Sequence, residues 1–364
     1  MTKKSRALLA TASAVTLLLT VAGCSSGASP SSPSESGGDT VPIDVGNDLT
    51  VNLTKETLNV AVFTPGVANQ YGQVMEQSAK DTAKELGIEM TLYDAGYDAN
   101  QQLNQMQTAL QSGDFDAAVV HPVDGTVICK ITTEDYPEAN ILVSNNVNPL
   151  CDYGTDQVGE SPEELWAPGT MNFVGSNNFM GYIDGWFTAA AEANPGPQKV
   201  LAVLGPATAA QTRVIEVALE KFEKANPEYE VEAINSDYMS TEAYTKTQAY
   251  LQGHPDTSLI LSIYTPDISQ GIVNAVTDAG LLGKVNIVDQ GFGDFSLEQI
   301  EEGNIQFSTM FFPANAMKLS LESLVEAQSG DAGSRFVDDS VVGTVLEPFA
   351  VTKDSIDELP DELR

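Results

Sequence analysis

The stretch LNVAVFTPGVANQY, residues 58–71, contains the signals of a strand, a loop and a helix start. Its first six residues are mostly apolar, and a short run of this kind is typical of a strand buried on both faces of a parallel sheet. Thr64, Pro65 and Gly66 end the run, and a polar loop leads on into a helix. In open α/β sheets such a loop lies at the carboxyl end of a strand, where ligands bind. We therefore expect residues 64–71 to form the first loop of a ligand cleft.

Strand and helix patterns alternate through the rest of the chain. Apolar runs predict strands at residues 58–63, 88–93, 117–120, 141–144, 171–174, 200–204, 231–234, 259–263, 285–288 and 341–346. Amphipathic patterns predict helices at residues 71–86, 99–110, 181–193, 211–225, 241–252, 268–279 and 316–327. Strands joined by such helices favour parallel sheets with right-handed crossovers. The pattern passes through two similar halves, so the predicted fold class is α/β with two lobes.

Length and charge limit the possible functions. A chain of 364 residues suits two lobes with separate cores better than one. It carries 51 acidic and 17 basic residues. Because such a surface repels phosphate backbones, we expect no nucleic-acid partner, and the acidity is explained as an adaptation for solubility.

The amino-terminal segment has the pattern of a targeting sequence. Lys3, Lys4 and Arg6 precede an apolar stretch at residues 7–22, which is shorter than the ~20 residues that a spanning helix needs. The stretch ends in VAGC, which resembles a bacterial lipobox with Cys24 as the lipidated residue. Residues 1–23 are therefore predicted to be a lipoprotein signal peptide, and an ordinary secretory signal is the alternative. Residues 24–54 are predicted to be the lipidated cysteine and a flexible tether, rich at first in Ser, Gly and Pro.

Two cysteines remain in the predicted mature chain, Cys129 and Cys151. In an oxidising compartment such a pair is most simply a disulfide, worth roughly 3 kcal/mol for a loop of this length. Two buried free thiols remain the alternative, because sequence does not show whether the pair can meet. Residues 148–169 interrupt the strand–helix pattern with prolines and acids, and we interpret them as an inserted surface segment.

Several motifs together resemble the type I periplasmic binding proteins, the ribose- and galactose-binding receptors of ABC importers. The motifs are FT at residues 63–64, NQY at 69–71, AKELGIEMTLYDAGYDANQQLNQMQTAL at 83–110, FDAAVVHPVD at 115–124, FVGSNN at 173–178, GPATAAQTR at 205–213 and IEEGNI at 300–305. The resemblance extends over residues 58–352.

The resemblance implies two Rossmann-like lobes with parallel sheets, joined by a three-strand hinge near Ser176, Met310 and Asp339. It places the amino-terminal lobe at residues 55–176 plus 312–339 and the carboxyl-terminal lobe at residues 177–311 plus 340–356. Residues 357–364 would be a tail.

The resemblance also implies a set of ligand-binding residues. They are Asn69, Tyr71, Asn145, Asn146, Asn178, Arg213, Tyr238, Thr265, Asp267, Asp289 or Gln290, and Phe311. Asn145 and Asn146 stand where the family has an Asp–Arg pair that grips sugar hydroxyls, and Phe311 stands where it has Gln. Since unpaired buried hydroxyls cost about 1–3 kcal/mol, these departures predict a larger, less hydroxylated or modified sugar, or another small polar solute. Arg213 would hold a hydroxyl pair or a carboxylate.

The predicted function is that of a solute-binding lipoprotein of a sugar ABC importer, on the outer face of a bacterial cell membrane. We expect a monomer that meets a membrane permease, uses no cofactor or metal and breaks no bond, because HExxH, GxSxG, P-loop and paired CxxC motifs are missing from the sequence. Three alternatives stay open: a ligand sensor for a membrane signalling partner, a lipid-anchored cell-envelope enzyme, and the effector domain of a sugar-responsive repressor. The last would need an amino-terminal helix-turn-helix in place of the signal and tether.

Overall fold

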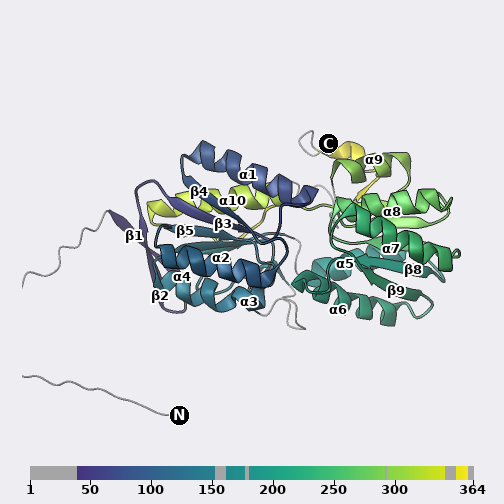
Figure 1. Cartoon of the computed structure of the whole chain (residues 1–364), viewed down its shortest axis with the longest axis horizontal. Helices are drawn as coiled ribbons and strands as arrows, with labels where there is room; N and C mark the ends of the chain where they lie inside the picture. The colour runs from purple at the N-terminus through teal and green to yellow at the C-terminus, as the bar shows by residue number, and fades with distance from the viewer. Residues whose placement is uncertain (1–38, 152–160, 177–179, 292, 341–349, 360–364) are drawn as a thin grey trace, which may run out of the picture. The chain divides into compact units, whose positions relative to one another are not determined.

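The computed structural model describes residues 39–151, 161–176, 180–291, 293–340 and 350–359. Its strands form two six-stranded sheets and one two-stranded hairpin (Figure 1). The predicted α/β class with two lobes and alternating strands and helices is confirmed. The predicted signal peptide, Cys24, Asn178 and the predicted strand at 341–346 lie outside the described residues.

The sheet of the amino-terminal lobe is parallel throughout, in the order β13-β7-β6-β5-β3-β4. Its strands are β3 (Asn59–Thr64), β4 (Glu89–Asp94), β5 (Ala117–Val120), β6 (Leu142–Asn146), β7 (Asn172–Val174) and β13 (Phe336–Val337). From its second residue onward β3 is buried. The apolar run at 58–63 is therefore an inner strand, as predicted.

Helices cover both faces of this sheet. They are α1 (Gln70–Leu86), α2 (Ala99–Ser112), α3 (Gly125–Lys130), α4 (Tyr136–Glu138) and α10 (Pro313–Glu326), with a π-helical turn (Ile131–Asp135) between α3 and α4. Met75 of α1 and Leu321 of α10 pack on Val60, and Met106 of α2 packs with Phe63 on the opposite face. Because successive strand residues point to opposite faces, β3 contributes to both cores.

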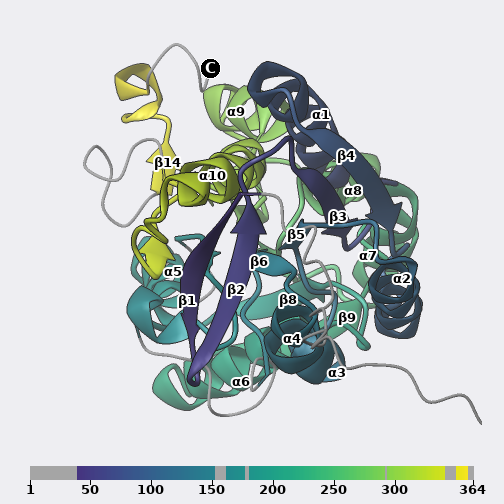
Figure 2. The ribbon, with the colours of Figure 1, turned by 90° about the vertical axis from the view of Figure 1, so that its left-hand side faces the viewer.

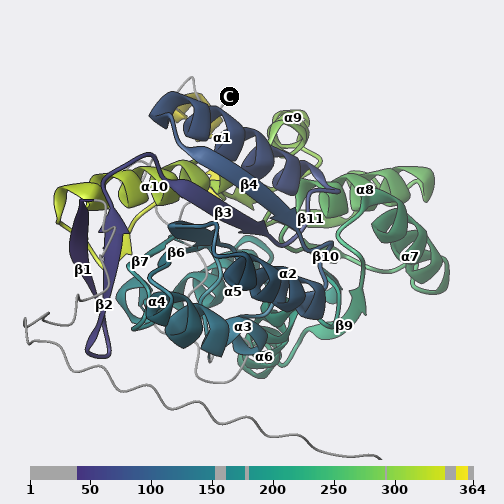
Figure 3. The same cartoon turned by 60° about the vertical axis from the view of Figure 1, so that its left-hand side comes forward.

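The sheet of the carboxyl-terminal lobe has the order β14-β12-β11-β10-β8-β9. Its strands are β8 (Lys199–Leu204), β9 (Glu230–Asn235), β10 (Leu259–Ser262), β11 (Asn286–Asp289), β12 (Phe307–Thr309) and β14 (Ala350–Thr352), and only β14 pairs antiparallel among these described strands. The helices are α5 (Met180–Ala193), α6 (Ala210–Ala225), α7 (Ser240–Gly253), α8 (Pro266–Asp278) and α9 (Asp294–Glu302). Helices α7 and α8 pack side by side (Figure 3).

Residues 40–54 correct the sequence analysis. The prediction of a flexible tether over residues 24–54 is wrong for this part, which forms an antiparallel hairpin of β1 (Thr40–Gly46) and β2 (Leu49–Thr54) (Figure 2). Alternate residues such as Ile43 and Leu53 are buried in the core of the amino-terminal lobe. The hairpin therefore extends that lobe, because its period-two apolar pattern supplies one face that packs on the lobe.

Two further segments differ from the expected exposure. Asn148, Leu150 and Leu165 are buried, so parts of the described ends of segment 148–169 pack into the lobe, whereas Glu164 and Pro168 are exposed. Leu359, in the predicted tail, is buried in the core of the carboxyl-terminal lobe.

The chain passes between the two sheets three times, after β7, after β12 and after β13. In the first, Ser176 donates from its hydroxyl to a carboxylate oxygen of Asp339 in the third at 2.5 Å. Helix α1 begins beside α8, where the backbone N–H of Gln70 donates to Oδ2 of Asp267 at 3.2 Å (Figure 3). The ends of the strands in both lobes thus reach one common region.

Candidate ligand-binding site

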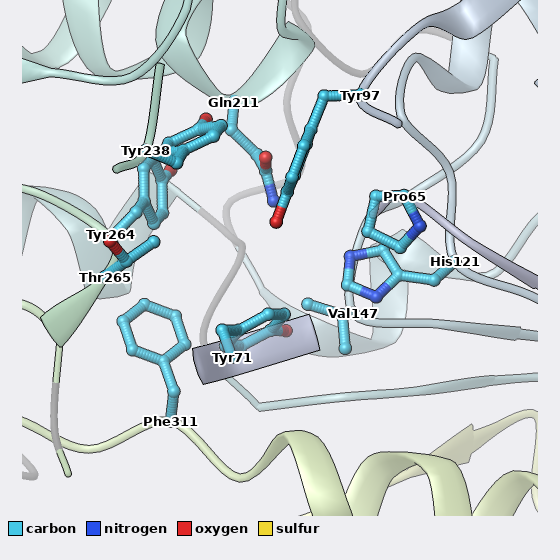
Figure 4. Close-up of a pocket in the computed structure, with 10 residues that line it drawn as sticks. All are labelled: Pro65, Tyr71, Tyr97, His121, Val147, Gln211, Tyr238, Tyr264, Thr265 and Phe311. Carbon is cyan, nitrogen blue, oxygen red and sulfur yellow. The ribbon is translucent and has the colours of Figure 1, made fainter. Parts of the chain in front are cut away.

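A cavity lies where loops from both lobes meet (Figure 4). The amino-terminal lobe contributes Pro65, Tyr71, Tyr97, His121 and Val147, and the carboxyl-terminal lobe contributes Gln211, Tyr238, Tyr264, Thr265 and Phe311. Most of these residues stand just after the carboxyl end of a parallel strand or at the start of the next helix. The cavity has a volume of about 30 Å³, which is enough for about two water molecules.

The backbone around the cavity is unusual. Tyr97, Val147, Tyr238 and Tyr264 have φ angles of 60°, 59°, 63° and 77°. L-residues other than glycine seldom adopt this left-handed region, least of all a β-branched one such as Val147. Backbone conformations of this kind gather at ligand sites, where the surrounding structure holds them in place. Four of the eight non-glycine residues with positive φ in the described part of the chain therefore line the cavity.

Two of the tyrosines occupy equivalent places in the two lobes. Tyr97 stands three residues beyond the end of β4, and Tyr238 stands three residues beyond the end of β9. Each ring lies on a glycine, so that an added Cβ would come 2.4 Å from Tyr97 at Gly66 and 2.1 Å from Tyr238 at Gly205. The ring centroids are 5.3 Å apart and the planes are inclined by 48°. Each lobe thus contributes one tyrosine to a pair that meets across the cavity.

Three further aromatic residues and one imidazole complete the walls. The ring of Tyr71 meets that of His121 edge-on, with centroids 6.1 Å apart, and the rings of Tyr264 and Phe311 are 6.0 Å apart. Burial lowers the pKa of His121 to about 3, so the imidazole is neutral at physiological pH. Burial likewise raises the pKa of Tyr238 to about 12 and keeps its phenol protonated.

Contacts between the lobes surround this cavity. A guanidinium nitrogen of Arg213, on α6, lies 2.7 Å from Oδ2 of Asp124, the N-cap of α3. Gln211 donates from Nε2 to Oδ1 of Asn148 at 2.6 Å. Since the partners come from different lobes, these bonds hold the lobes against one another around the cavity.

The predicted site residues divide into two groups. Tyr71, Tyr238, Thr265 and Phe311 line the cavity. Asn69, Asn145, Asn146, Arg213, Asp267, Asp289 and Gln290 are not among the lining residues. Ligand contact by any of them stays a prediction, and for the second group the structure shows other roles.

Asn69 holds a residue of the cavity wall, Tyr97, in place. Its Oδ1 accepts the backbone N–H of Gly72 at 2.9 Å and so caps α1, and its Nδ2 donates to the hydroxyl of Tyr97 at 2.7 Å. Arg213 is engaged by Asp124, and Asp267 accepts the first N–H of α1. These three residues position the lobes and a tyrosine.

The two asparagines at the end of β6 face the lobe interior. Asn145 donates from Nδ2 to the carbonyl of Asn148 at 3.0 Å, and Asn146 donates to the hydroxyl of Ser320 on α10 at 3.1 Å. The Oδ1 atoms of both asparagines are buried without a hydrogen-bond partner among the described residues, so ligand contact through these oxygens stays a prediction.

Asp289 is a buried structural carboxylate. It accepts hydrogen bonds from the hydroxyls of Ser269, Ser296 and Ser308 and from the backbone N–H of Gly291. Burial raises the pKa of its carboxyl. Its neighbour Gln290 is also buried, and its side-chain amide has no hydrogen-bond partner within the described ranges.

Five cavity residues are missing from the site residues named from the sequence: Tyr97, His121, Val147, Gln211 and Tyr264. Each follows a predicted strand or opens a predicted helix, so position alone was the available signal. The expected disulfide is confirmed, with Cys129 of α3 bonded to Cys151. The described part of the chain holds no cluster of three metal-ligating side chains. Within the same part, every helix is too short or too polar to cross a bilayer.

Comparison with known families identifies the fold. The sequence model of the periplasmic binding protein domain matches residues 60–332. The chain belongs to this family. The resemblance to type I periplasmic binding proteins is thereby confirmed, and the family is one of non-catalytic solute-binding proteins of ABC transporters. No curated protein matches the sequence.

Solved structures share the periplasmic binding protein fold. A Mycobacterium smegmatis ABC transporter solute-binding protein with bound glycerol has a TM-score of 0.66 at 20% identity, over 83% of this chain and 96% of that one. The Caulobacter myo-inositol binding protein has a TM-score of 0.66 at 18% sequence identity, over 83% of this chain and 95% of that one. The periplasmic binding protein of the arabinose ABC transporter from Shewanella sp. ANA-3, bound to α- and β-L-arabinofuranose, has a TM-score of 0.66 at 14% sequence identity. The match covers 82% of this chain and 93% of that one. At these identities the likeness concerns the fold.

Proposed function

We propose that this chain is an extracytoplasmic solute-binding lipoprotein of an ABC importer, held by Cys24 at the outer face of a bacterial cell membrane. It binds a sugar or sugar-like small polar solute between its lobes and delivers it to the permease. The observation that carries the proposal is the cavity, whose walls come from strand ends in both lobes. The similar structures with glycerol, myo-inositol and arabinofuranose support a small polyhydroxylated solute. Because the cavity has room for about two water molecules, such a solute requires the lobes to lie farther apart than in this structure.

Binding works by hinge closure. The three passages of the chain between the sheets, after β7, β12 and β13, let the lobes part, and a solute that contacts both lobes stabilises the closed form. Closure removes water, which strengthens the hydrogen bonds to the solute. The bond between Arg213 and Asp124 adds to the closed form without touching the solute. The permease then recognises the closed lobes.

A ligand screen tests the binding function. The melting temperature should rise with the concentration of a bound solute from a panel of sugars, polyols, nucleosides and amino acids, because a ligand that binds only the folded state stabilises it. Tyr71→Ala should strongly lower the affinity for the best hit, since the ring of Tyr71 forms part of the cavity wall. Lys221→Ala, which breaks an ion pair within one lobe, is the control and should bind normally. A panel that leaves the melting temperature unchanged would contradict the proposal.

A second experiment tests the anchor and the transport role. In cells, Cys24→Ser should abolish incorporation of labelled fatty acid and release the protein from the membrane. Deletion of the gene should abolish uptake of the labelled best hit. Normal uptake without the protein would point to the sensing alternative, and retention of the Cys24→Ser protein at the membrane would contradict lipidation.

A further inference from the structure

Two polar atoms in the cavity wall have no hydrogen-bond partner in the described part of the chain. They are Nδ1 of His121, in the amino-terminal lobe, and the hydroxyl oxygen of Tyr238, in the carboxyl-terminal lobe. Both are buried, and buried polar atoms in native proteins are nearly always hydrogen-bonded, because an unpaired one has given up its bonds to water without replacement. Since both residues line the cavity, a solute in this place would supply the missing partners.

The surroundings of Tyr238 do not satisfy its hydroxyl. Burial raises the pKa of this phenol, and the nearby hydroxyl of Thr212 acts in the opposite direction. The two hydroxyls nevertheless do not satisfy each other, because each is buried without a hydrogen-bond partner among the described residues. The protonated phenol is therefore a donor for an oxygen of the solute.

Each of the two residues is held by its own lobe. The backbone N–H of His121 donates to the carbonyl of Phe63 at 3.0 Å, and its carbonyl accepts from Nε2 of the buried Gln102 at 2.8 Å. The ring of Tyr238 lies on Gly205. Because none of these contacts crosses between the lobes, both side chains keep their places when the lobes part. A solute larger than the present cavity then meets them on opposite walls of a wider cleft.

The polar groups of the lining suit neutral hydroxyls. Burial lowers the pKa of His121 to about 3, so its imidazole is neutral, with one nitrogen as donor and the other as acceptor. The hydroxyl of Tyr97 accepts from Nδ2 of Asn69 at 2.7 Å and retains its own proton for donation. Figure 4 shows this hydroxyl and the imidazole directed toward the same hollow. A hydroxyl of the solute both donates and accepts, so it fits either group.

The charged groups next to the cavity are engaged with protein partners. None of the ten lining side chains is charged at neutral pH. The guanidinium of Arg213 is paired with Asp124 at 2.7 Å, and Asp267 accepts the backbone N–H of Gln70 at 3.2 Å. A solute carboxylate reaches Arg213 only by displacing Asp124, which then loses its cationic partner. Removing an unpaired charge from water costs far more than removing a hydroxyl, so the site disfavours charged solutes.

We propose that His121 and Tyr238, one from each lobe, are the hydrogen-bonding contacts by which the cleft selects a neutral hydroxylated solute over its charged derivatives. The proposal rests on the proposed function, because it takes the cavity as the place where the solute binds. It narrows the solute to uncharged sugars and cyclic polyols, and it excludes sugar acids, amino sugars and amino acids. Of the two partners that the sequence analysis leaves open for Arg213, it rules out the carboxylate.

Matched probes test the selectivity for neutral solutes. The full-length protein in detergent is titrated calorimetrically at neutral pH with D-galactose, D-glucose, L-arabinose and myo-inositol. D-galacturonate, D-glucuronate, D-galactosamine and D-glucosamine are the charged probes. At least one neutral probe should bind, and every charged probe should bind at least about a hundredfold more weakly than the best neutral one, because its charge is buried without a partner. A charged probe that binds within this factor would overturn the proposal.

Variants test the two contacts. Tyr238→Phe and His121→Leu remove the polar atoms and should each lower the affinity for the best neutral probe about tenfold, the effect of one lost hydrogen bond. His121→Asn returns a polar atom close to the position of Nδ1 and should restore most of the affinity. Tyr250→Phe and His254→Asn, at two rings stacked on one another outside the cavity lining, are the matched controls and should bind normally. Unchanged affinity in both Tyr238→Phe and His121→Leu would overturn the proposal.

The melting temperature of the solute-free protein separates binding from a structural role. Because the hydroxyl of Tyr238 is buried without a partner, Tyr238→Phe removes an unsatisfied group and should not lower the melting temperature. A hydroxyl that bonds within the protein would behave in the opposite way. A lower melting temperature together with unchanged affinity would therefore overturn the role of Tyr238 in binding.

The ligand panel separates this proposal from the one on which it rests. Binding of an amino acid or a nucleoside, with no response to any neutral sugar or polyol, would overturn the selection of neutral sugars and leave the solute-binding function in place. If every probe and every member of the panel fail to bind, both proposals fail.

Discussion

At the scale of single residues, two glycines decide where the cavity tyrosines lie. Gly66 follows β3 and Gly205 follows β8, and each leaves room for a ring that any Cβ would displace. The tyrosines reach these places from left-handed backbone conformations, at φ angles of 60° and 63°. The glycines are therefore as much a part of the site as the rings that lie on them.

Gly205→Ala should displace the ring of Tyr238. The new methyl would come within 2.1 Å of that ring. Overpacking of this kind typically lowers the free energy of unfolding by about 1–3 kcal/mol. Because the displaced ring belongs to the cavity wall, we expect ligand binding to weaken by a similar free energy. Urea unfolding and titration with the best hit of the ligand panel measure both effects. Gly185→Ala on α5, where an added Cβ meets nothing within 4 Å, is the control and should stabilise by about 0.5–1 kcal/mol. Unchanged stability and affinity in Gly205→Ala would refute this role.

The sequence indicates which loops form the site but not which side chains face it. Asn145 and Asn146 were correctly expected at the carboxyl end of a strand, but the sequence did not show that their Nδ2 atoms donate to Asn148 and Ser320 while their Oδ1 atoms are buried without a partner among the described residues. Whether a side chain after a strand turns to the cavity or to the core depends on partners from distant segments. Tyr97 was missed for the same reason, because its ring is placed by Gly66 and Asn69.

At the scale of elements, strands and long helices were predictable because their apolar periods are strong. The hairpin β1–β2 was missed although Val41, Ile43 and Val45 alternate with exposed residues. The preceding Ser/Gly/Pro-rich segment suggested that the tether continued into it. Short strands such as β12 and β13 were missed because three or two residues carry too little pattern.

The disulfide between Cys129 and Cys151 ties α3 to the segment that follows β6. Reduction should lower the free energy of unfolding by about 3 kcal/mol, because the cross-link restricts the unfolded chain over a loop of this length. Urea unfolding with and without dithiothreitol measures the change. The double variant Cys129→Ser/Cys151→Ser should be insensitive to dithiothreitol, and a wild-type chain equally stable in both conditions would contradict the expectation.

At the scale of the whole chain, the bond between Arg213 and Asp124 links the lobes beside the cavity. Asp124→Asn should preserve the cap of α3, since asparagine also caps helices well, but remove the charge pair. For a half-buried pair we expect a loss of about 1 kcal/mol from the closed form, seen as faster ligand dissociation and up to about tenfold weaker binding. Asp184→Asn, which breaks the pair with Lys221 inside one lobe, should leave binding unchanged. Equal dissociation rates in the two variants would show that the interlobe pair is irrelevant to closure.

The hinge contains a buried carboxyl group whose charge costs stability. Burial and, to a smaller extent, the charge of Asp338 raise the pKa of Asp339 to about 7, although the hydrogen bond from Ser176 acts in the opposite direction. Between pH 4 and 7 the unfolded chain therefore releases this proton while the folded chain retains it. The contribution of Asp339 to stability falls as pH rises through this window and is constant above about pH 7.

Asp339→Asn should remove that pH dependence. Asparagine can still accept from Ser176, and the backbone carbonyl at this position still accepts from Asn315. Relative to wild type, the variant should gain stability from pH 4 to pH 7, by at most about 4 kcal/mol for a shift of this size. Urea unfolding across pH 4–8 measures the difference, with Asp48→Asn, an exposed aspartate in the turn between β1 and β2, as the control. Asp339 and Ser176 lie in two different connections between the lobes, so a gain in stability that appears only with ligand bound would link this proton to lobe closure. Parallel curves of stability against pH for wild type and variant would show that Asp339 titrates normally.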